Sequence, residues 1–194
     1  HYNETVKKAA IYNIAVNAHE PIKPTGLRRT YPNTISREGL RGQEFNVWDP
    51  KGGNPPEHLS IIAFTRMLAG PIDYTPGIFN IKLDNYKKGK QVNTTIAHQL
   101  ALYVVIYSPI QMAADLVEHY EANPKPLEFI KEVGVDWEKT KVLNGEVGDF
   151  VTIARKERKT GNWFLGSITD ENSREIRIDS KFFNMIFDGN DTFF

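Results

Sequence analysis

The sequence contains no cysteine among its 194 residues. This absence excludes disulfide bonds, a thiolate nucleophile and any metal site built on thiolates. A bound metal would therefore be held by oxygen atoms or by imidazole nitrogens. The chain also lacks a net charge, because 24 Lys and Arg balance 24 Asp and Glu. That balance argues against binding to nucleic acids or to anionic membranes, both of which require a basic surface.

Long hydrophobic runs are absent as well. No segment approaches the roughly 20 consecutive apolar residues that cross a bilayer as a helix. Neither the HExxH pattern of zinc proteases nor the GxxxxGK[ST] loop of phosphate-binding enzymes occurs, so these two site classes are unsupported. The overall composition, with 40% hydrophobic and 25% charged residues, is that of an ordinary globular protein.

Both ends of the sequence look cut. The chain opens with HYNETVKKAA, which has no initiator methionine and no signal peptide, and residues 5–10 resemble the last turns of a helix. It closes with FNMIFDGNDTFF, a strand-and-turn pattern that stops on two aromatic residues. We expect the chain to be a fragment of a longer enzyme.

The first part of the chain has the pattern of an α/β protein. Residues 11–18 (IYNIAVNA) predict a buried strand that ends at His19 and Glu20. Polar residues at the carboxyl end of a strand are where α/β barrels place catalytic groups. Residues 21–58 are rich in Gly and Pro and predict a long loop, a feature that is usually functional. Residues 59–70 predict a helix, and the sequence PIDYTPGIF that follows predicts a short strand or turn.

The second part of the chain changes its pattern. Residues 94–122 predict the longest helix, interrupted at Pro109. After residue 126 come short alternating segments, VLNGEVGDFVTIARKE, NWFLGSITDEN and REIRID, separated by Asn-Gly, Thr-Gly and Asp-Glu-Asn turns. We therefore expect an α/β region followed by an antiparallel β-domain, with the boundary near residue 130.

Four glutamates lie in the Gly- and Pro-rich part of the chain, namely Glu20, Glu38, Glu44 and Glu57. Carboxylates that converge repel one another, so a true cluster needs a proton or a cation. Calcium takes six to eight oxygen ligands and suits such loops. The same residues are also the type that serves as general acid and general base in glycoside cleavage. Spacing alone does not decide between a site and four unrelated surface carboxylates.

Other residues with chemical potential remain ambiguous at this level. His19 fits either a ligand for substrate hydroxyls or a hydrogen-bonded structural residue. Trp48 fits either a platform for a sugar ring or a packing residue. His58 and His98 are more typical of structural histidines.

Several long motifs together identify a family. NAHEPIKPTGLRRTYPN, SREGLRGQEF, GNPPEH and FTRMLAGPIDYTPG resemble glycoside hydrolase family 97, and AHQLALYVVIYSPIQMAADL and LNGEVGDFVTIARKE continue the resemblance over essentially the whole chain. The family contains calcium-dependent α-glucosidases and α-galactosidases of Gram-negative gut bacteria. Its members have an N-terminal β-supersandwich, a catalytic (β/α)8 barrel and a C-terminal β-sandwich. By resemblance, residues 1–130 are the last part of the barrel and residues 131–194 part of the antiparallel β-sandwich domain.

The resemblance also implies roles for individual residues. Glu44 matches the general acid, which in the inverting branch also contacts calcium. Glu20 matches a catalytic base and calcium ligand, Glu38 a further calcium ligand, and His19 a residue of the sugar subsite. The retaining α-galactosidases lack the glutamate after this histidine and use an upstream aspartate as nucleophile. The presence of Glu20 therefore favours inversion.

The leading hypothesis is a calcium-dependent, inverting exo-α-glucosidase that acts on starch-derived α-gluco-oligosaccharides in the periplasm. A retaining α-galactosidase of the same family is the alternative, and a non-catalytic carbohydrate-binding or structural fragment is the alternative from another class. A second candidate for the base and one more calcium ligand lie upstream of these residues in the family. We therefore expect the isolated chain to be inactive and to associate with the rest of its catalytic domain or with copies of itself.

Overall fold

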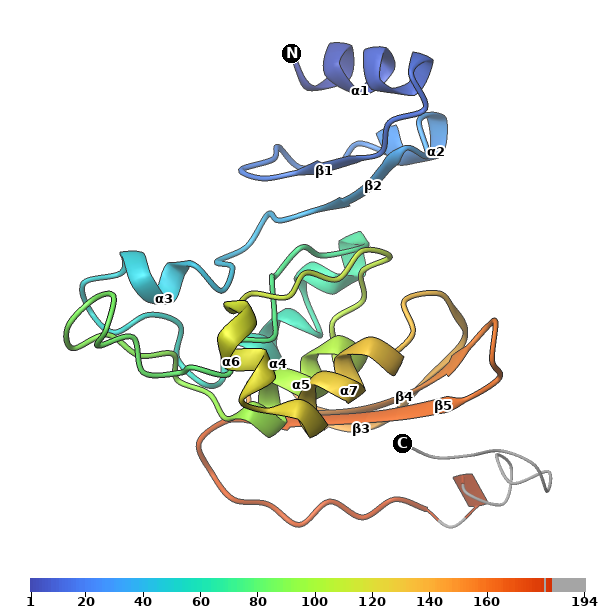
Figure 1. The fold of residues 1–194 in the computed structure, drawn as a ribbon. Coiled ribbons are helices and arrows are strands. Elements are labelled where there is room, and N and C mark those ends of the chain that lie inside the picture. The colour runs from blue at the N-terminus through green and yellow to red at the C-terminus, as the bar shows by residue number, and fades with distance from the viewer. Residues whose placement is uncertain (180, 183–194) are drawn as a thin grey trace.

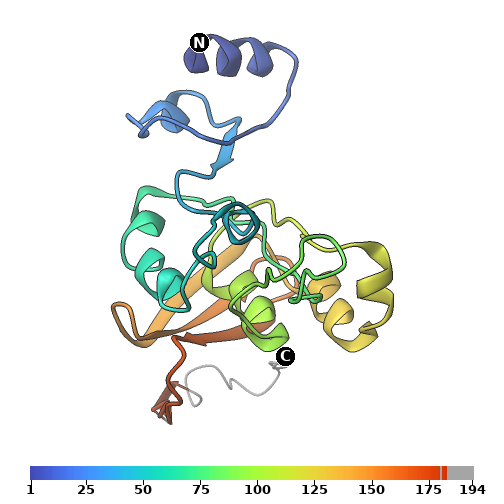
Figure 2. The same ribbon diagram turned by 90° about the vertical axis from the view of Figure 1, so that its left-hand side faces the viewer.

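The structure is a computed structural model that describes residues 1–179 and 181–182. The strands and helices within these residues are the following: α1 (Tyr2–Ile11), β1 (Val16–Ala18), α2 (Leu27–Thr30), β2 (Thr34–Arg37), α3 (Phe45–Trp48), α4 (His58–Ile62), a 3-10 helix (Arg66–Ala69), α5 (Ile96–Val105), α6 (Val117–Glu121), α7 (Pro124–Glu132), β3 (Trp137–Glu146), β4 (Phe150–Glu157) and β5 (Trp163–Thr169). In Figure 1, α1, α2, β1 and β2 lie at one end of the molecule and the sheet β3–β5 lies towards the other, with α4, α5, α6 and α7 between them. The view in Figure 2 shows the same separation.

The N-terminal end contains a two-stranded parallel sheet with further chain segments beside it. β1 pairs in parallel with β2. The backbone N–H of Asp73 then donates to the carbonyl oxygen of Arg37 at 3.0 Å, and the N–H of Ile72 donates to the carbonyl oxygen of Tyr107 at 2.9 Å. Segments that follow one another in the sequence thus lie next to one another in space, in the order β1, β2, residues 72–73 and residue 107.

The predicted strand at residues 11–18 is wrong in its first half. The helix predicted over residues 5–10 is confirmed as α1 and continues through Ile11, and only Val16–Ala18 are a strand. Ile11, Tyr12 and Ile14 are exposed. A short apolar run does not distinguish a strand from a helix end by periodicity, which explains the error. Within the predicted loop 21–58, the four-residue strand β2 was too short to recognise.

The helical predictions needed three corrections. The segment 59–70 is divided into α4 and a 3-10 helix. The long helix 94–122 is interrupted, as expected near Pro109, but α5 already ends at Val105 and α6 begins only at Val117. The helix α7 was missed because of its two prolines. They occupy its first turn, where a missing N–H and a fixed φ do not disturb the helix.

The predicted antiparallel β-region is confirmed by the sheet β3–β4–β5. The turn expected at Thr160-Gly161 connects β4 and β5, but Asn144-Gly145 lies inside β3, next to an irregularity in the pairing with β4. The segment REIRID, residues 174–179, forms no strand. Within the described residues, β3, β4 and β5 form one three-stranded sheet, and the second sheet of a sandwich is not among them.

The main hydrophobic core lies between the helices and this sheet. It joins buried residues from both sides of the predicted boundary near residue 130, including Leu102 and Val105 of α5 and Ile153 of β4. α5 comes very close to β5 at Gly166, where an added Cβ would lie 2.7 Å from Cβ of Val104. The division into domains at residue 130 remains a prediction, and its C-terminal end, residues 183–194, lies outside the described residues.

The buried Arg155 of β4 reinforces this contact. Its guanidinium donates hydrogen bonds to the carbonyl oxygens of Val104 and Val105 at the end of α5. These carbonyls have no partner within the helix, so the arginine satisfies them. Burial lowers the pKa of Arg155 to about 10. Among the residues the structure describes, no helix is long and apolar enough to cross a bilayer.

Candidate active site

Three side chains meet at the end of the parallel segments. His19 follows β1, Glu38 follows β2, and Glu44 immediately precedes α3. Each contributes one ligand atom to a group whose atoms all lie within 4.8 Å of one another. Two carboxylates and one imidazole therefore face a common point, from residues that are up to 25 positions apart in the sequence.

Glu38 is the buried member of this group. One carboxylate oxygen, Oε2, accepts a hydrogen bond from the backbone N–H of Glu20 at 3.1 Å. The same oxygen lies 3.8 Å from Nδ1 of His19, which is beyond hydrogen-bonding distance. The other oxygen, Oε1, would be 3.2 Å from a Cβ added at Gly42, so the absence of a side chain there leaves room for the carboxylate. The position of Glu38 is thus fixed by the surrounding main chain.

Glu20 enters the site through its backbone. Its φ angle of 48° lies in the left-handed region, which is uncommon for a residue other than glycine. In this conformation, the backbone N–H of Glu20 donates its hydrogen bond to the carboxylate of Glu38. The carbonyl oxygen of Glu20 accepts a hydrogen bond from the hydroxyl of Tyr2 at 2.7 Å. The carboxylate of Glu20 is exposed and is not among the atoms of the three-residue group. Its roles as base and metal ligand remain predictions.

Arg66 ties together the chain segments that carry the site. Its guanidinium donates to the carbonyl oxygens of Glu38 at 3.1 Å and Arg37 at 2.9 Å, and to those of Gly70 and Pro71. Burial is the main cause that lowers its pKa, to about 10. The arginine connects the end of β2 to the segment that leads into residues 72–73.

The loop around Glu44 is anchored by buried amides. Gln43 donates through Nε2 to Oε1 of Gln99 at 3.0 Å, and the N–H of Asn54 donates to Oδ1 of Asn46 at 2.9 Å. Gln43, Asn46, Asn54 and Gln99 are all buried, whereas Glu44 is exposed. The amides hold the loop to the protein while the carboxylate of Glu44 remains accessible to a ligand.

Asp73 was not singled out from the sequence. It is 3% exposed, and its Oδ2 accepts hydrogen bonds from Nδ2 of Asn17 at 2.5 Å and from Nε2 of His19 at 2.8 Å. The hydrogen bond to Asp73 is the largest cause of a raised pKa for His19, and the negative charges of Glu38 and Glu44 act in the same direction. The signal in the sequence that could have pointed to Asp73 is a carboxylate within the predicted short strand PIDYTPGIF, flanked by an isoleucine and a tyrosine.

The remaining residues considered from the sequence lie outside the group. Glu57 occupies the N-cap position of α4. His58 is buried against the carbonyl oxygen of Arg41, and burial lowers its pKa, as it does more strongly for His98, to about 4. Both histidines have the structural role that was expected. Trp48 is 72% exposed, and the ammonium group of Lys87 lies 5.9 Å from its ring centre.

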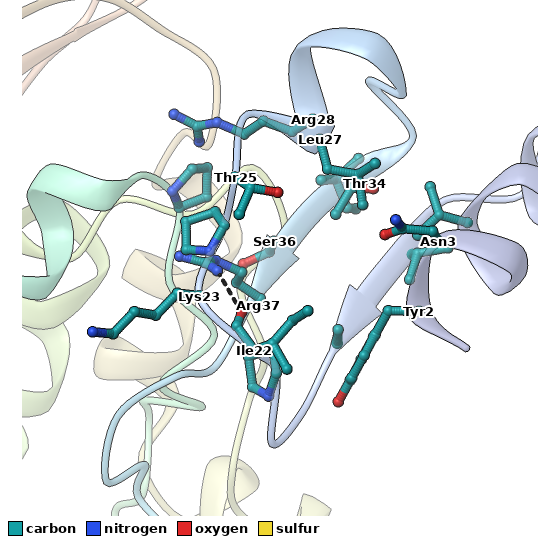
Figure 3. Close-up of a pocket in the computed structure, with 17 residues that line it drawn as sticks. Tyr2, Asn3, Ile22, Lys23, Thr25, Leu27, Arg28, Thr34, Ser36 and Arg37 are labelled. Carbon is teal, nitrogen blue, oxygen red and sulfur yellow. Dashed lines mark hydrogen bonds between the residues drawn. The ribbon is translucent and has the colours of Figure 1, made fainter.

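A separate pocket lies beside the same strands (Figure 3). Its wall combines apolar side chains with the basic residues Lys23, Arg28 and Arg37, and Arg37 donates a hydrogen bond to the carbonyl oxygen of Ile22. None of the four predicted site residues lines this pocket, and no carboxylate does. Its chemistry does not suit a cation, so we place the candidate active site at the three-residue group.

The donor set of the group is compatible with calcium. The carboxylates of Glu38 and Glu44 are the hard oxygen ligands that this ion prefers. His19 is a less suitable direct ligand, because imidazole nitrogen favours transition metals. In addition, Nε2 of His19 is already engaged by Asp73. The two carboxylates would therefore hold the ion, and further oxygens would have to complete its coordination.

Comparison with known proteins agrees with the resemblance noted in the sequence. Residues 1–40 match the family described as glycoside hydrolase 97, and residues 136–187 match the one described as glycosyl-hydrolase 97 C-terminal, oligomerisation. The retaining α-galactosidase of Bacteroides thetaiotaomicron is 36% identical over 177 residues, which are 89% of this chain and 26% of that protein. A probable retaining α-galactosidase of Streptomyces bingchenggensis is 32% identical and aligns with 85% of this chain and 24% of its own length.

Solved structures give the same result. A glycoside hydrolase family 97 enzyme from Pseudoalteromonas sp. strain K8, determined in complex with panose and also with acarbose, is 57% identical, with a TM-score of 0.84. The match covers 90% of this chain and 27% of that one. The present chain thus spans about a quarter of the length of its relatives and corresponds to their C-terminal part. The chain belongs to glycoside hydrolase family 97.

Proposed function

We propose that this chain carries part of the active site of a calcium-dependent, inverting exo-α-glucosidase that acts on α-gluco-oligosaccharides derived from starch. The observation that carries the proposal is the convergence of Glu38, Glu44 and His19 within 4.8 Å, with Glu20 directly after His19. The comparisons support a glycoside hydrolase, and the finer assignment depends on these residues.

The parallel segments support a barrel as the complete architecture. β1 and β2 pair in parallel, residues 72–73 and 107 follow beside them in chain order, and His19, Glu38 and Asp73 lie at or near the ends of these segments. Catalytic groups of (β/α)8 barrels occupy the carboxyl ends of successive strands in this way. In this proposal, a segment upstream of residue 1, of the kind that the longer relatives have, supplies the other strands.

Each residue has a defined task in the proposed reaction. Glu44, which is accessible, donates a proton to the departing glycosidic oxygen. Glu20 accepts a proton from the attacking water, a role that in inverting enzymes requires a separation of about 6.5–9.5 Å from the acid. His19 binds a sugar hydroxyl. When bound, calcium would offset the repulsion between the site carboxylates and orient a hydroxyl or a water molecule.

A retaining α-galactosidase is the second candidate, and the two curated relatives carry that name. The structural relative at 57% identity was determined with panose, a trisaccharide of α-linked glucose units. Together with Glu20, this ligand favours the glucosidase. The two activities differ both in the sugar that they accept and in the stereochemistry of the product.

The test uses protein expressed from the longest reading frame that contains these residues. Hydrolysis of maltose and of a nitrophenyl α-galactoside is followed by proton NMR during the first minutes. We expect maltose to be cleaved with β-glucose as the first product. The appearance of α-galactose from the galactoside would instead establish the retaining alternative, and hydrolysis of neither substrate would contradict both.

Calcium dependence is tested on the same protein. We expect EGTA to abolish hydrolysis of maltose and added calcium to restore it, because Glu38 and Glu44 repel each other without the ion. Activity that survives exhaustive chelation would contradict the metal proposal. The isolated 194-residue chain should show no activity, since it would lack most of the barrel.

Two further parts of the proposal concern the whole protein. Because residues 136–187 match a family part described as oligomerisation, we propose a homo-oligomer, which light scattering after gel filtration would detect. Periplasmic location is proposed from the family, and cell fractionation tests it. A monomer would contradict the proposed homo-oligomer, and a cytoplasmic enzyme would contradict the proposed periplasmic location.

A further inference from the structure

The strongest unexplained group near the site is the buried carboxylate of Asp73. It comes from a segment 54 residues away from His19 and is almost completely removed from solvent. A carboxylate in such surroundings is costly unless its oxygens are hydrogen-bonded. Three side chains meet it: Asn17 and His19 at Oδ2, and the hydroxyl of Thr75 at Oδ1, 3.4 Å away. Two of them approach the same oxygen from the end of β1.

The direction of the hydrogen bond to His19 follows from the chemistry of the two groups. An ionised carboxylate only accepts hydrogen bonds, so Nε2 of His19 must carry the proton that it shares with Asp73. The opposite nitrogen, Nδ1, lies 3.8 Å from Oε2 of Glu38, too far for a hydrogen bond. In the neutral ring, Nδ1 is therefore an acceptor that faces the group of carboxylates.

We propose that Asp73 is a positioning residue for the glycosidase reaction. It holds His19 as the Nε2–H tautomer, so that Nδ1 can accept a hydrogen bond from a hydroxyl group of the sugar. This inference rests on the proposed function. An imidazole free to rotate would present either Nδ1 or Nε2 to the substrate. Asp73 removes this ambiguity, and Asn17 keeps the carboxylate in place beside the ring.

A second pair in the molecule provides a matched control. Asp115 is also largely buried and contacts His119, with 2.5 Å between Oδ1 and Nδ1. Its other oxygen accepts the backbone N–H groups of Phe79 and Asn80, both at 2.7 Å. These residues are not part of the three-residue group. Asp115→Asn therefore disturbs an Asp–His pair and local stability without a connection to the proposed chemistry.

The first experiment is a double-mutant cycle in the complete protein, with kcat and KM for maltose and the melting temperature measured for each variant. Asp73→Asn should lower kcat/KM about 10- to 100-fold, the usual effect of losing a group that orients a functional histidine. In a His19→Ala background the same substitution should have little further effect, because its target is gone. Asp115→Asn should lower the melting temperature while kcat/KM stays close to that of the parent.

Equal losses from Asp73→Asn with and without His19 would overturn the proposal, because they would show a general structural role. Unchanged kcat/KM in folded Asp73→Asn would overturn it as well. If that variant does not fold, the unmodified protein still decides the matter. Nitrogen NMR of ¹⁵N-histidine-labelled protein, with the His19 signals assigned by the His19→Ala variant, reports which ring nitrogen carries the proton.

We expect the Nε2–H tautomer of His19, and an Nδ1–H tautomer would refute the inference. This measurement needs no turnover, so the two proposals can fail separately. A protein that cleaves neither maltose nor a galactoside, yet holds His19 as Nε2–H through Asp73, would contradict the proposed function alone. An active glycosidase with His19 as Nδ1–H would contradict only the role of Asp73.

Discussion

The two ends of the molecule hold their residues in place by different forces. Around the candidate site, Glu38 is fixed by hydrogen bonds from the main chain of Glu20 and from Arg66, and Glu44 and His19 remain accessible. Between α5 and the sheet, residues such as Leu102 and Ile153 are almost fully buried in an apolar core. Around the candidate site the named contacts are thus mainly hydrogen bonds, whereas between α5 and the sheet they are mainly apolar. Substitutions at the two ends should separate activity from folding.

The largest effect is expected from removing the proposed acid. Glu44→Gln should lower kcat for maltose about 100- to 10,000-fold, because the amide cannot donate a proton as the carboxylic acid does. The exposed position of Glu44 means that the melting temperature should change little. Glu57→Gln, a loop glutamate outside the group, is the matched control and should retain activity. A non-catalytic binding fragment would instead show no turnover in either protein and unchanged affinity for maltose.

The opposite pattern is expected in the core. Phe164 of β5 is 1% exposed and contacts the rings of Phe129 and Trp137. Phe164→Ala should cost about 3–5 kcal/mol in the free energy of unfolding, through lost burial and the cavity that remains. Urea denaturation measures this cost. Turnover per folded molecule should not change, and a specific loss of kcat would show that the two ends are coupled.

A smaller effect is expected from adding a single methyl group to the same interface. Gly166→Ala places Cβ 2.7 Å from Cβ of Val104 and 2.9 Å from the carbonyl oxygen of Ala101, which is backbone and cannot rotate away. The overpacking should destabilise the protein by about 1–3 kcal/mol. Ser173→Ala, at an exposed position after β5, serves as control. Equal stability of the two variants would contradict the close contact between α5 and β5.

The smallest effect concerns pH. Burial lowers the pKa of His98 to about 4, below the value of about 6.5 in the unfolded chain. The unfolded state therefore takes up a proton first as the pH falls, and stability that is present above pH 6.5 is lost between about 6.5 and 4. At pH 5.5 this loss should be about 1 kcal/mol. His98→Gln should flatten this part of the stability profile, and an unchanged slope would exclude His98 as its cause.

His19 illustrates the contrast, since the same residue type has the opposite shift. Its pKa is raised, mainly because it donates a hydrogen bond to Asp73. Any stability that this histidine contributes is complete below pH 6.5 and is lost as the pH rises through its raised pKa. Burial lowers the pKa of His98, whereas the carboxylates around His19 raise its pKa.

Local chemistry allowed parts of the fold to be predicted from the sequence. The alternating pattern and the Thr160-Gly161 turn correctly predicted antiparallel strands, because hairpins pair segments that are close in the chain. The same reasoning failed for residues 174–179, where an alternating pattern has no partner strand in the described part of the chain. It also failed for α7, where prolines suggested a break although they begin the helix.

The sequence by itself determined the family, through long motifs around His19, Glu38 and Glu44, whose roles in the site remain predictions. Only the tertiary structure decided that Glu20 contributes its backbone N–H to the carboxylate of Glu38, and that Asp73 stands behind His19. The physical reason is distance along the chain. Residues 54 positions apart meet only through the tertiary fold, and no local pattern in the sequence records which side chain will lie beside His19.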